Sequence, residues 1–142
     1  MLPLRSPRFR LFAALLTRFG LASTLISGVA DRFGAWGRPG APNVSWGDFQ
    51  HFVAKVQAIF PSAPAALALV MAWAATVLDA ALGLGLLLGI RTRTMAFASG
   101  ILFLVYAVAT ALSPAGVHAM FAYGILGLSG ASMLLAIVVD DT

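Results

Sequence analysis

Residues 64–90 read PAALALVMAWAATVLDAALGLGLLLGI, and one of these side chains, Asp79, is charged. A helix that crosses the roughly 30 Å hydrocarbon core of a bilayer needs about 20 mainly apolar residues. Three other stretches have a similar composition: 11–30, in which Arg18 is the one charged residue, and 95–112 and 119–139, which have none. The sequence therefore predicts an all-α integral membrane protein with four spans.

The composition excludes a water-soluble globular protein. Hydrophobic residues make up 61% of the chain and charged residues 10%, whereas soluble domains contain about 25% charged residues. The 142 residues are filled by the spans and their connections, so we expect one transmembrane domain over 1–142, folded as a four-helix bundle. The basic residues lie mainly in tails and loops without interleaved aromatic residues. This pattern indicates contacts with the lipid bilayer and no nucleic-acid partner.

The chain contains no cysteine, which excludes disulfides, thiolate metal sites and Cys-x-x-Cys redox chemistry. Any redox role would need a bound cofactor or a partner, and the sequence shows no cofactor motif. A quinone or a lipid is the ligand that we consider for the bundle.

The N-terminus also resembles a secretory signal peptide. Three arginines precede the first apolar run, and residues 28–30 (GVA) resemble a signal-peptidase site. Arg18 argues against cleavage, because it leaves only 11–17 as an uninterrupted apolar core. A full span tolerates an arginine that snorkels or pairs, so we expect the first helix to be retained.

The numbers of lysines and arginines in the short loops predict the orientation of the chain. The N-terminal tail and the connection between the second and third spans hold five basic residues: Arg5, Arg8, Arg10, Arg91 and Arg93. The opposite side holds three, spread over a longer loop: Arg32, Arg38 and Lys55. We therefore expect both termini to be cytoplasmic.

The outer loop between the first two spans contains a predicted helix. Residues 34–42 are rich in glycine and proline and end the first helix, and Ser45 with Asp48 three residues later resembles a capping box. Apolar residues then recur at helical spacing: Phe49, Phe52, Val53, Val56, Ile59 and Phe60. We expect a short amphipathic helix over about 46–60, lying at the outer interface of the membrane with Trp36 and Trp46. It is either a lid packed across the bundle or a gate over a cavity between the spans.

Asp79 is the leading intramembrane candidate, because a carboxylate near the middle of a span must be protonated, paired or directed into a cavity. Helical spacing puts small residues on its side of the helix, so we expect this face to pack inward. They are Ala72, Ala75, Thr76 and Gly83. Arg18 is one candidate partner, since the offset in depth is within reach of an arginine. Alternatively, Arg18 snorkels toward the cytoplasm, because a small and polar stripe on the first helix lies on nearly the opposite side: Gly20, Thr24, Ser27 and Asp31.

Four other residues are candidates for polar or ligand contacts. Tyr106 and Tyr123 each offer a hydroxyl to the bundle, and His51 and His118 lie on the predicted outer side. Two imidazoles there offer nitrogen atoms to a metal, a haem or a quinone headgroup. A metal site normally has more ligands at fixed spacing, so we expect no metal, and no catalytic residue is assigned.

Glycines in two spans predict close packing of neighbouring helices. They are Gly83, Gly85 and Gly89 in the second span and Gly124, Gly127 and Gly130 in the fourth.

Two stretches resemble the DoxX-like family of small membrane proteins. The first is Arg18-Phe19-Gly20 with Ser27-Gly28 ahead of a broken outer loop, and the second is 78–85 (LDAALGLG) followed by 88–93 (LGIRTR). Asp79 stands where a glutamate is usual in the family, and the fourth span lacks the acidic residue that some members carry. The resemblance covers nearly the full chain in helix number and spacing. It implies a four-helix bundle of the bacterial inner membrane, sometimes linked to quinone-dependent oxidoreductases such as the DoxD part of thiosulfate:quinone oxidoreductase.

The sequence leaves three functions open. The first is an accessory or scaffold subunit, whose bundle packs on a membrane protein partner or a second copy, or holds a lipid or quinone near Asp79. The second is an enzyme component that uses a quinone, and the third is a small-molecule or proton transporter. Without a visible electron-transfer group or a detectable internal repeat, we expect the first function and no enzyme activity of the isolated chain.

Overall fold

The computed structural model describes residues 6–140, and all regular secondary structure in this range is α-helical. The helices are α1 (Pro7–Arg32), α2 (Phe49–Ile59), α3 (Ala65–Leu88), α4 (Thr92–Leu112), α5 (Gly116–Ala122) and α6 (Ile125–Val138). Three of them, α1, α3 and α4, are long and apolar enough to cross a membrane, and α5 with α6 forms a fourth such stretch, bent by 51°. The predicted all-α class is confirmed. Arg5, which contributes to the predicted orientation, lies outside the described residues.

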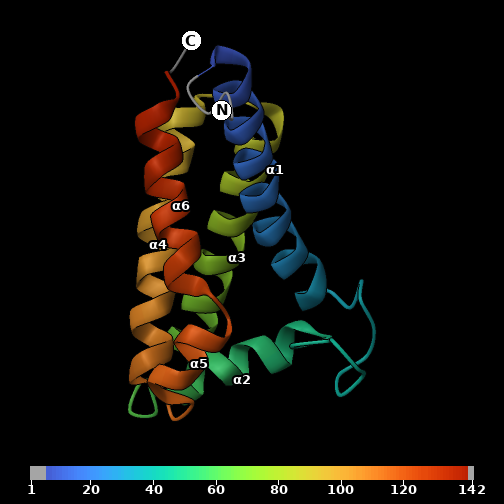
Figure 1. Ribbon diagram of the computed structural model, residues 1–142. Coiled ribbons are helices and arrows are strands. Elements are labelled where there is room, and N and C mark those ends of the chain that lie inside the picture. The colour runs from blue at the N-terminus through green and yellow to red at the C-terminus, as the bar shows by residue number, and fades with distance from the viewer. Residues whose placement is uncertain (1–5, 141–142) are drawn as a thin grey trace.

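The long helices pack in two pairs that are joined through α3 and α4. α1 lies along α3, and α4 lies along α6 (Figure 1). The start of α1, the end of α6 and the short α3–α4 connection lie at one end of the molecule. The helices α2 and α5 lie at the opposite end, which Figure 1 shows at the bottom. The molecule therefore has two chemically different ends, referred to below as the termini end and the α2 end.

Capping groups fix where the long helices begin and end. α1 begins before the predicted residue 11, because Oγ of Ser6 accepts a hydrogen bond from the backbone N–H of Phe9 at 3.2 Å and Pro7 takes the first helical position. α3 ends at Leu88, because Gly89 adopts the left-handed conformation with φ 73°. The predicted spans started at the first apolar residue, and this criterion does not detect a polar cap.

α1 and α3 approach each other closely at Gly83, as the glycines of α3 predict. A Cβ atom built on Gly83 would lie 2.9 Å from Cγ1 of Ile26 and 3.1 Å from Cβ of Leu25. The absence of a side chain at this position therefore sets the distance between the two helices.

The face of α1 that packs inward carries Leu21, Ala22 and Leu25. The small and polar stripe lies on another side of α1: it is exposed at Gly20 and Thr24 and becomes buried at Asp31, where the loop after α1 covers it. Arg18 lies on the same side of α1 as Ala22 and Leu25, so the arginine is directed toward α3 although the stripe suggested otherwise.

The fourth predicted span, 119–139, is not one continuous helix. It is broken between α5 and α6 at Tyr123 and Gly124, where Gly124 adopts φ 64° and the helix axis turns by 51°. Gly127 and Gly130 lie on an open side of α6, where a Cβ would meet no atom within 4 Å. The close approach predicted for these two glycines is therefore not made within the described chain.

α2 begins at Phe49, three residues later than the predicted start at residue 46. Asp48, not Ser45, is the N-cap, and its Oδ1 accepts a hydrogen bond from the backbone N–H of His51 at 2.8 Å. Phe52 is the buried residue of this helix, whereas Gln50 and Lys55 are exposed on the other side. The amphipathic pattern is confirmed, and its apolar side packs on α3.

α1 stops well short of the α2 end of the molecule. Its last residue, Arg32, contacts Thr76 and Asp79 of α3, which lie 11 and 14 residues after Ala65 at the start of α3. At 1.5 Å per residue, the contacts of Arg32 therefore lie roughly 16 to 21 Å along α3 from its first residue, Ala65. α2 and the loop after α1 occupy the space that α1 leaves (Figure 1). The polar end of α1 is therefore covered by the outer segment, which we define as residues 33–60.

Candidate functional site

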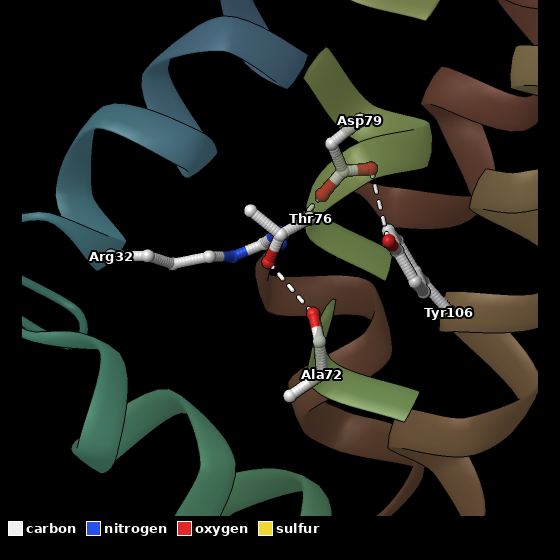
Figure 2. A network of polar contacts seen from close by, with 5 residues as sticks. All are labelled: Arg32, Ala72, Thr76, Asp79 and Tyr106. Carbon is white, nitrogen blue, oxygen red and sulfur yellow. Dashed lines mark hydrogen bonds and ion pairs between the residues drawn. The ribbon is translucent and has the colours of Figure 1, made fainter. Parts of the chain in front are cut away.

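A buried ion pair joins the end of α1 to α3. Nη2 of Arg32 lies 2.5 Å from Oδ2 of Asp79, and the two side chains are 4% and 3% exposed. Nη1 of Arg32 donates a hydrogen bond to Oγ1 of Thr76 at 2.9 Å, and Thr76 donates to the carbonyl oxygen of Ala72 at 2.7 Å. Figure 2 shows the arginine extending from α1 to these residues of α3. The hydrogen bonds around the pair help to offset the cost of removing two charges from water.

Tyr106 of α4 completes the surroundings of the carboxylate. Its hydroxyl donates a hydrogen bond to Oδ1 of Asp79 at 2.9 Å (Figure 2). Each oxygen of Asp79 therefore has a donor from another helix, one from α1 and one from α4. A hydrogen bond to a charged group is stronger than one between neutral groups, so this carboxylate links three helices.

Aromatic rings of the outer segment cover the other side of the arginine. Cζ of Arg32 lies 3.8 Å from the ring centroid of Phe52 and 5.3 Å from that of Trp46. The two rings pack edge to face with centroids 5.1 Å apart. A guanidinium over an aromatic face gains a cation–π attraction that strengthens when water is removed. Arg32 is thus held between a carboxylate and a pair of rings.

Asp31, directly before Arg32, holds the loop of the outer segment. Its Oδ2 accepts hydrogen bonds from the backbone N–H groups of Ser45 at 2.9 Å and Trp46 at 3.1 Å. Asp31 is 5% exposed, so these bonds replace water at a buried carboxylate. The two consecutive residues at the end of α1 therefore have different partners: Asp31 binds the loop of the outer segment, and Arg32 joins α1 to α3.

The loop is folded tightly enough to require glycine. Gly47 adopts φ 75°, and a Cβ there would lie 2.4 Å from the backbone nitrogen of Pro39. Trp36 turns back along α1, where its Nε1 donates to the carbonyl oxygen and to Oγ of Ser27, both at 3.1 Å. These contacts bring Trp46 to a defined position over Arg32.

The structure brings together two of the predicted intramembrane residues, Asp79 and Tyr106. Asp79 is 2% exposed and points inward, with Ala72, Thr76 and Gly83 buried on the same side of α3, as expected. Arg18 does not take part. The partner of Asp79 is Arg32, a residue expected in the outer loop.

The antiparallel register of α1 and α3 explains why Arg18 is not the partner. Leu25 lies opposite Gly83, and Arg18 lies opposite Gly89, one turn beyond the glycine run. Asp79, further along α3 in the other direction, must then meet the end of α1, where Arg32 lies. The predicted offset in depth takes Arg10 and Arg91 to lie at the same level of the membrane. With Arg18 opposite Gly89, Arg10 instead lies roughly 12 Å beyond that level along α1.

The remaining candidates lie apart from this centre. Tyr123 ends α5 and is 69% exposed, and His118 is exposed on α5. His51 is exposed on α2, where Nδ1 of its ring lies 2.8 Å from Oδ1 of Asp48. Within residues 6–140 no three His, Cys, Asp or Glu side chains are grouped so that they could hold a metal ion.

Asp48 is perturbed by its role as a helix cap. The pKa of its carboxyl lies below the ordinary value of 3.8, because the backbone N–H of His51 bonds to the carboxylate, and the His51 side chain adds a second interaction. This shift marks a stabilised helix start and needs no catalytic explanation.

A depression of about 550 Å³ lies at the termini end, between the start of α4 and the end of α6. It is lined by Arg93, Thr94, Phe97, Met133, Ala136 and Ile137. The residues around Asp79 do not contribute to it. The ion-pair centre and this depression are therefore separate features.

Sequence reasoning missed Arg32, Phe52 and Trp46 as parts of the centre. Arg32 lies next to the glycine-rich loop, where a basic residue is typical of an orientation signal. The helical spacing of the apolar residues placed Phe52 on a buried face without indicating what it covers. One feature of the sequence does point to Arg32. Asp31 and Arg32 lie at the end of an apolar span, where charged side chains need partners just as a charge within the span does.

The chain matches no family model, no curated protein and no solved structure. Both oxygens of Asp79 accept hydrogen bonds, one from Arg32 and one from Tyr106, and the rings of Phe52 and Trp46 cover the arginine. This arrangement holds α1, α3, α4 and the outer segment in one position.

Proposed function

We propose that this protein is a non-catalytic accessory or scaffold subunit of a membrane complex, and that the Arg32–Asp79 centre maintains its shape. One observation carries this proposal: both oxygens of Asp79 accept bonds from side chains of the same chain. A carboxylate that exchanges protons or binds a substrate must present an oxygen to it. Here the donors are Arg32 and Tyr106, on two other helices.

The neighbouring hydroxyls support the same function over quinone chemistry. A quinone near Asp79 needs hydrogen-bond donors for its carbonyl oxygens. The two hydroxyls at this place already donate elsewhere, Thr76 to the carbonyl oxygen of Ala72 and Tyr106 to Asp79. Both would have to give up a bond to receive a quinone.

The proposal includes a four-span bundle in the bacterial inner membrane, with α2 as an interfacial lid and both termini in the cytoplasm. The exposed basic residues Arg8, Arg10 and Arg91 at the termini end support this orientation, because cytoplasmic loops carry an excess of lysine and arginine. The amphipathic helix α2 covers the opposite end, which supports its role as a lid. The resemblance to DoxX-like proteins, in residues 78–85 above all, agrees with this arrangement.

Open helix surfaces support an interaction with a partner or a second copy. On α6, Gly127 and Gly130 leave a smooth side with no atom of the described chain near it. On α1, Gly20 and Thr24 are exposed in the same way. In a membrane, small residues let the backbones of neighbouring helices approach closely. These sides suit contacts with another transmembrane helix.

Native mass spectrometry of the protein, extracted gently from its own membrane, tests the proposed function. We expect a complex of defined stoichiometry that survives Asp79→Asn less well than Tyr123→Phe, which alters an exposed residue. A bound quinone or haem would instead support an enzyme component. A monomer without partner, or a symmetric oligomer with a hydrated central path, would overturn the accessory function.

Reporter fusions test the proposed orientation separately. Reporters within 91–94 and after residue 142 should score as cytoplasmic, and a reporter within 37–43 should score as external. An external C-terminus would contradict the four-span arrangement.

A further inference from the structure

The guanidinium of Arg18 lies at the end of α3, at the termini end of the molecule. A Cβ built on Gly89 would lie 3.0 Å from Nη1 and 3.6 Å from Cζ of Arg18. Gly89 is the left-handed cap of α3, so the missing side chain leaves the room that the guanidinium occupies. The arginine thus reaches the carboxyl end of a neighbouring helix, where the helix dipole favours a positive charge.

Arg18 has no acidic partner among residues 6–140. The ion pairs of this part of the chain join Arg32 to Asp79 and His51 to Asp48. The Nε atom of Arg18 is buried and makes no hydrogen bond within the described residues, while Cζ lies 5.0 Å from the ring centroid of Phe19. The charge of this partly exposed guanidinium is therefore not neutralised by an acidic side chain of the described residues, which favours an anion from outside the chain.

Further basic residues continue from Arg18 toward the surface. Arg91 is exposed two residues after Gly89, so its Cα lies within about 7.6 Å of that of Gly89. Arg8 and Arg10 are exposed in the first turn of α1, roughly 12 to 15 Å along the helix from Arg18. This arrangement provides several positive charges between the helix surface and the membrane boundary.

Apolar side chains border the same place. Leu88 is 68% exposed and Ile90 is 52% exposed, on either side of Gly89. On α1, Leu11 is 61% exposed and lies seven residues, or two turns, before Arg18 on the same side of the helix. A soluble anion would need the arginines alone, whereas the apolar side chains also offer a surface to acyl chains.

We propose that Arg18 and Arg91 bind the phosphate of an anionic phospholipid, whose acyl chains lie against α1 and α3. A guanidinium binds two phosphate oxygens through parallel N–H groups, which suits Arg18 better than a lysine. Basic pockets between transmembrane helices are a known way to bind anionic headgroups. The binding does not depend on the function proposed above, because Arg18 lies far from the Arg32–Asp79 centre along α1.

Lipid retention measured by native mass spectrometry tests this inference. The protein is placed in detergent with equal amounts of phosphatidylglycerol and phosphatidylcholine, and the variants are Arg18→Gln and the control Arg38→Gln, at an exposed position of the outer segment. We expect wild type and the control to retain phosphatidylglycerol in preference to phosphatidylcholine, and Arg18→Gln to lose roughly fivefold or more of this preference. Inorganic phosphate alone should not displace the lipid.

Arg91→Gln is the second variant, because Arg91 is exposed and its replacement leaves the packing intact. Arg91→Gln should also reduce the preference for phosphatidylglycerol over phosphatidylcholine. Arg18→Lys should retain more of this preference than Arg18→Gln but less than wild type. The inference is wrong if neither Arg18→Gln nor Arg91→Gln changes lipid retention, or if millimolar phosphate removes the bound lipid from wild type.

Discussion

Arg32, the last residue of α1, pairs with Asp79 at the middle of α3, although 47 positions separate them in the sequence. The side chains are almost fully buried, with 2.5 Å between Nη2 and Oδ2. The pair also contacts α4 through Tyr106 and the outer segment through Phe52. Four parts of the chain therefore depend on one charged contact.

Removing one partner of this pair should be costly. For Arg32→Gln we expect the free energy of unfolding to fall by about 3–5 kcal/mol, because Asp79 would remain as a buried charge without its ion-pair partner. The double variant Arg32→Gln with Asp79→Asn should recover part of the loss. Melting in detergent, analysed as a double-mutant cycle, measures the coupling.

Arg18→Gln is the matched control for this cycle, since it removes the same charge from the same helix. Its effect should add to that of Asp79→Asn without coupling, because Arg18 lies beside Gly89. A coupling between Arg18 and Asp79 as large as that of Arg32 would show that the register of α1 on α3 is wrong.

Tyr106→Phe should remove one bond to the carboxylate and leave the packing of the ring unchanged. We expect a loss of about 1.5–3 kcal/mol, as for a hydrogen bond to a charged group. Tyr123→Phe deletes the same hydroxyl at a 69% exposed position and should have little effect. Equal melting temperatures of the two variants would argue that Asp79 does not need the tyrosine.

Gly83→Ala should push α1 away from α3, because the new methyl group would meet Ile26 at 2.9 Å. Overpacking of this kind costs about 1–3 kcal/mol. Gly20→Ala is the control, since nothing lies within 4 Å of its Cβ, and alanine favours a helix over glycine by about 1 kcal/mol. The melting temperature of Gly83→Ala should lie below that of wild type, and that of Gly20→Ala should lie above it. If both melting temperatures shift in the same direction, the close approach of the helices at Gly83 is not real.

The start of α2 should weaken in acid. The pKa of Asp48 is lowered in the folded protein, so its carboxylate stabilises the fold above the ordinary value of 3.8, and this contribution is lost as the pH falls through the lowered value. Amide hydrogen exchange of residues 49–51, corrected for the intrinsic rate, should show constant protection above pH 3.8 and declining protection below it. Asp48→Asn keeps a good N-cap and should abolish this pH dependence.

The fold class and the inward position of Asp79 could be predicted from the sequence, because span length, hydropathy and helical spacing are local properties. The partner of Asp79 could not. It depends on which turn of α1 lies opposite which turn of α3. That register follows the close approach of α1 to Gly83, about one turn from Asp79 and two turns from Arg32. A difference of a few residues in the relative level of the two helices is enough to make Arg18 a candidate partner when it is not one.

The break at Gly124 shows a similar limit. Residues 119–139 are apolar throughout, and hydropathy does not distinguish a straight helix from two helices joined at a left-handed glycine. The left-handed conformation of Gly124 separates the two helices, and the bond from the backbone N–H of His51 to Asp48 sets the start of α2. Composition thus predicts the long apolar helices, whereas individual caps set where they end.

The two arginines of α1 also relate the lengths of two helices to each other. Arg18 and Arg32 are 14 residues apart, and their contacts on α3, Gly89 and Thr76, are 13 residues apart. At 1.5 Å per residue these are nearly equal distances, about 21 Å and 20 Å. An insertion or deletion in one helix would therefore break one contact or the other, whereas the loss of a whole turn from both helices together would preserve both. Among proteins built on this plan, we expect α1 and α3 to change length only in step.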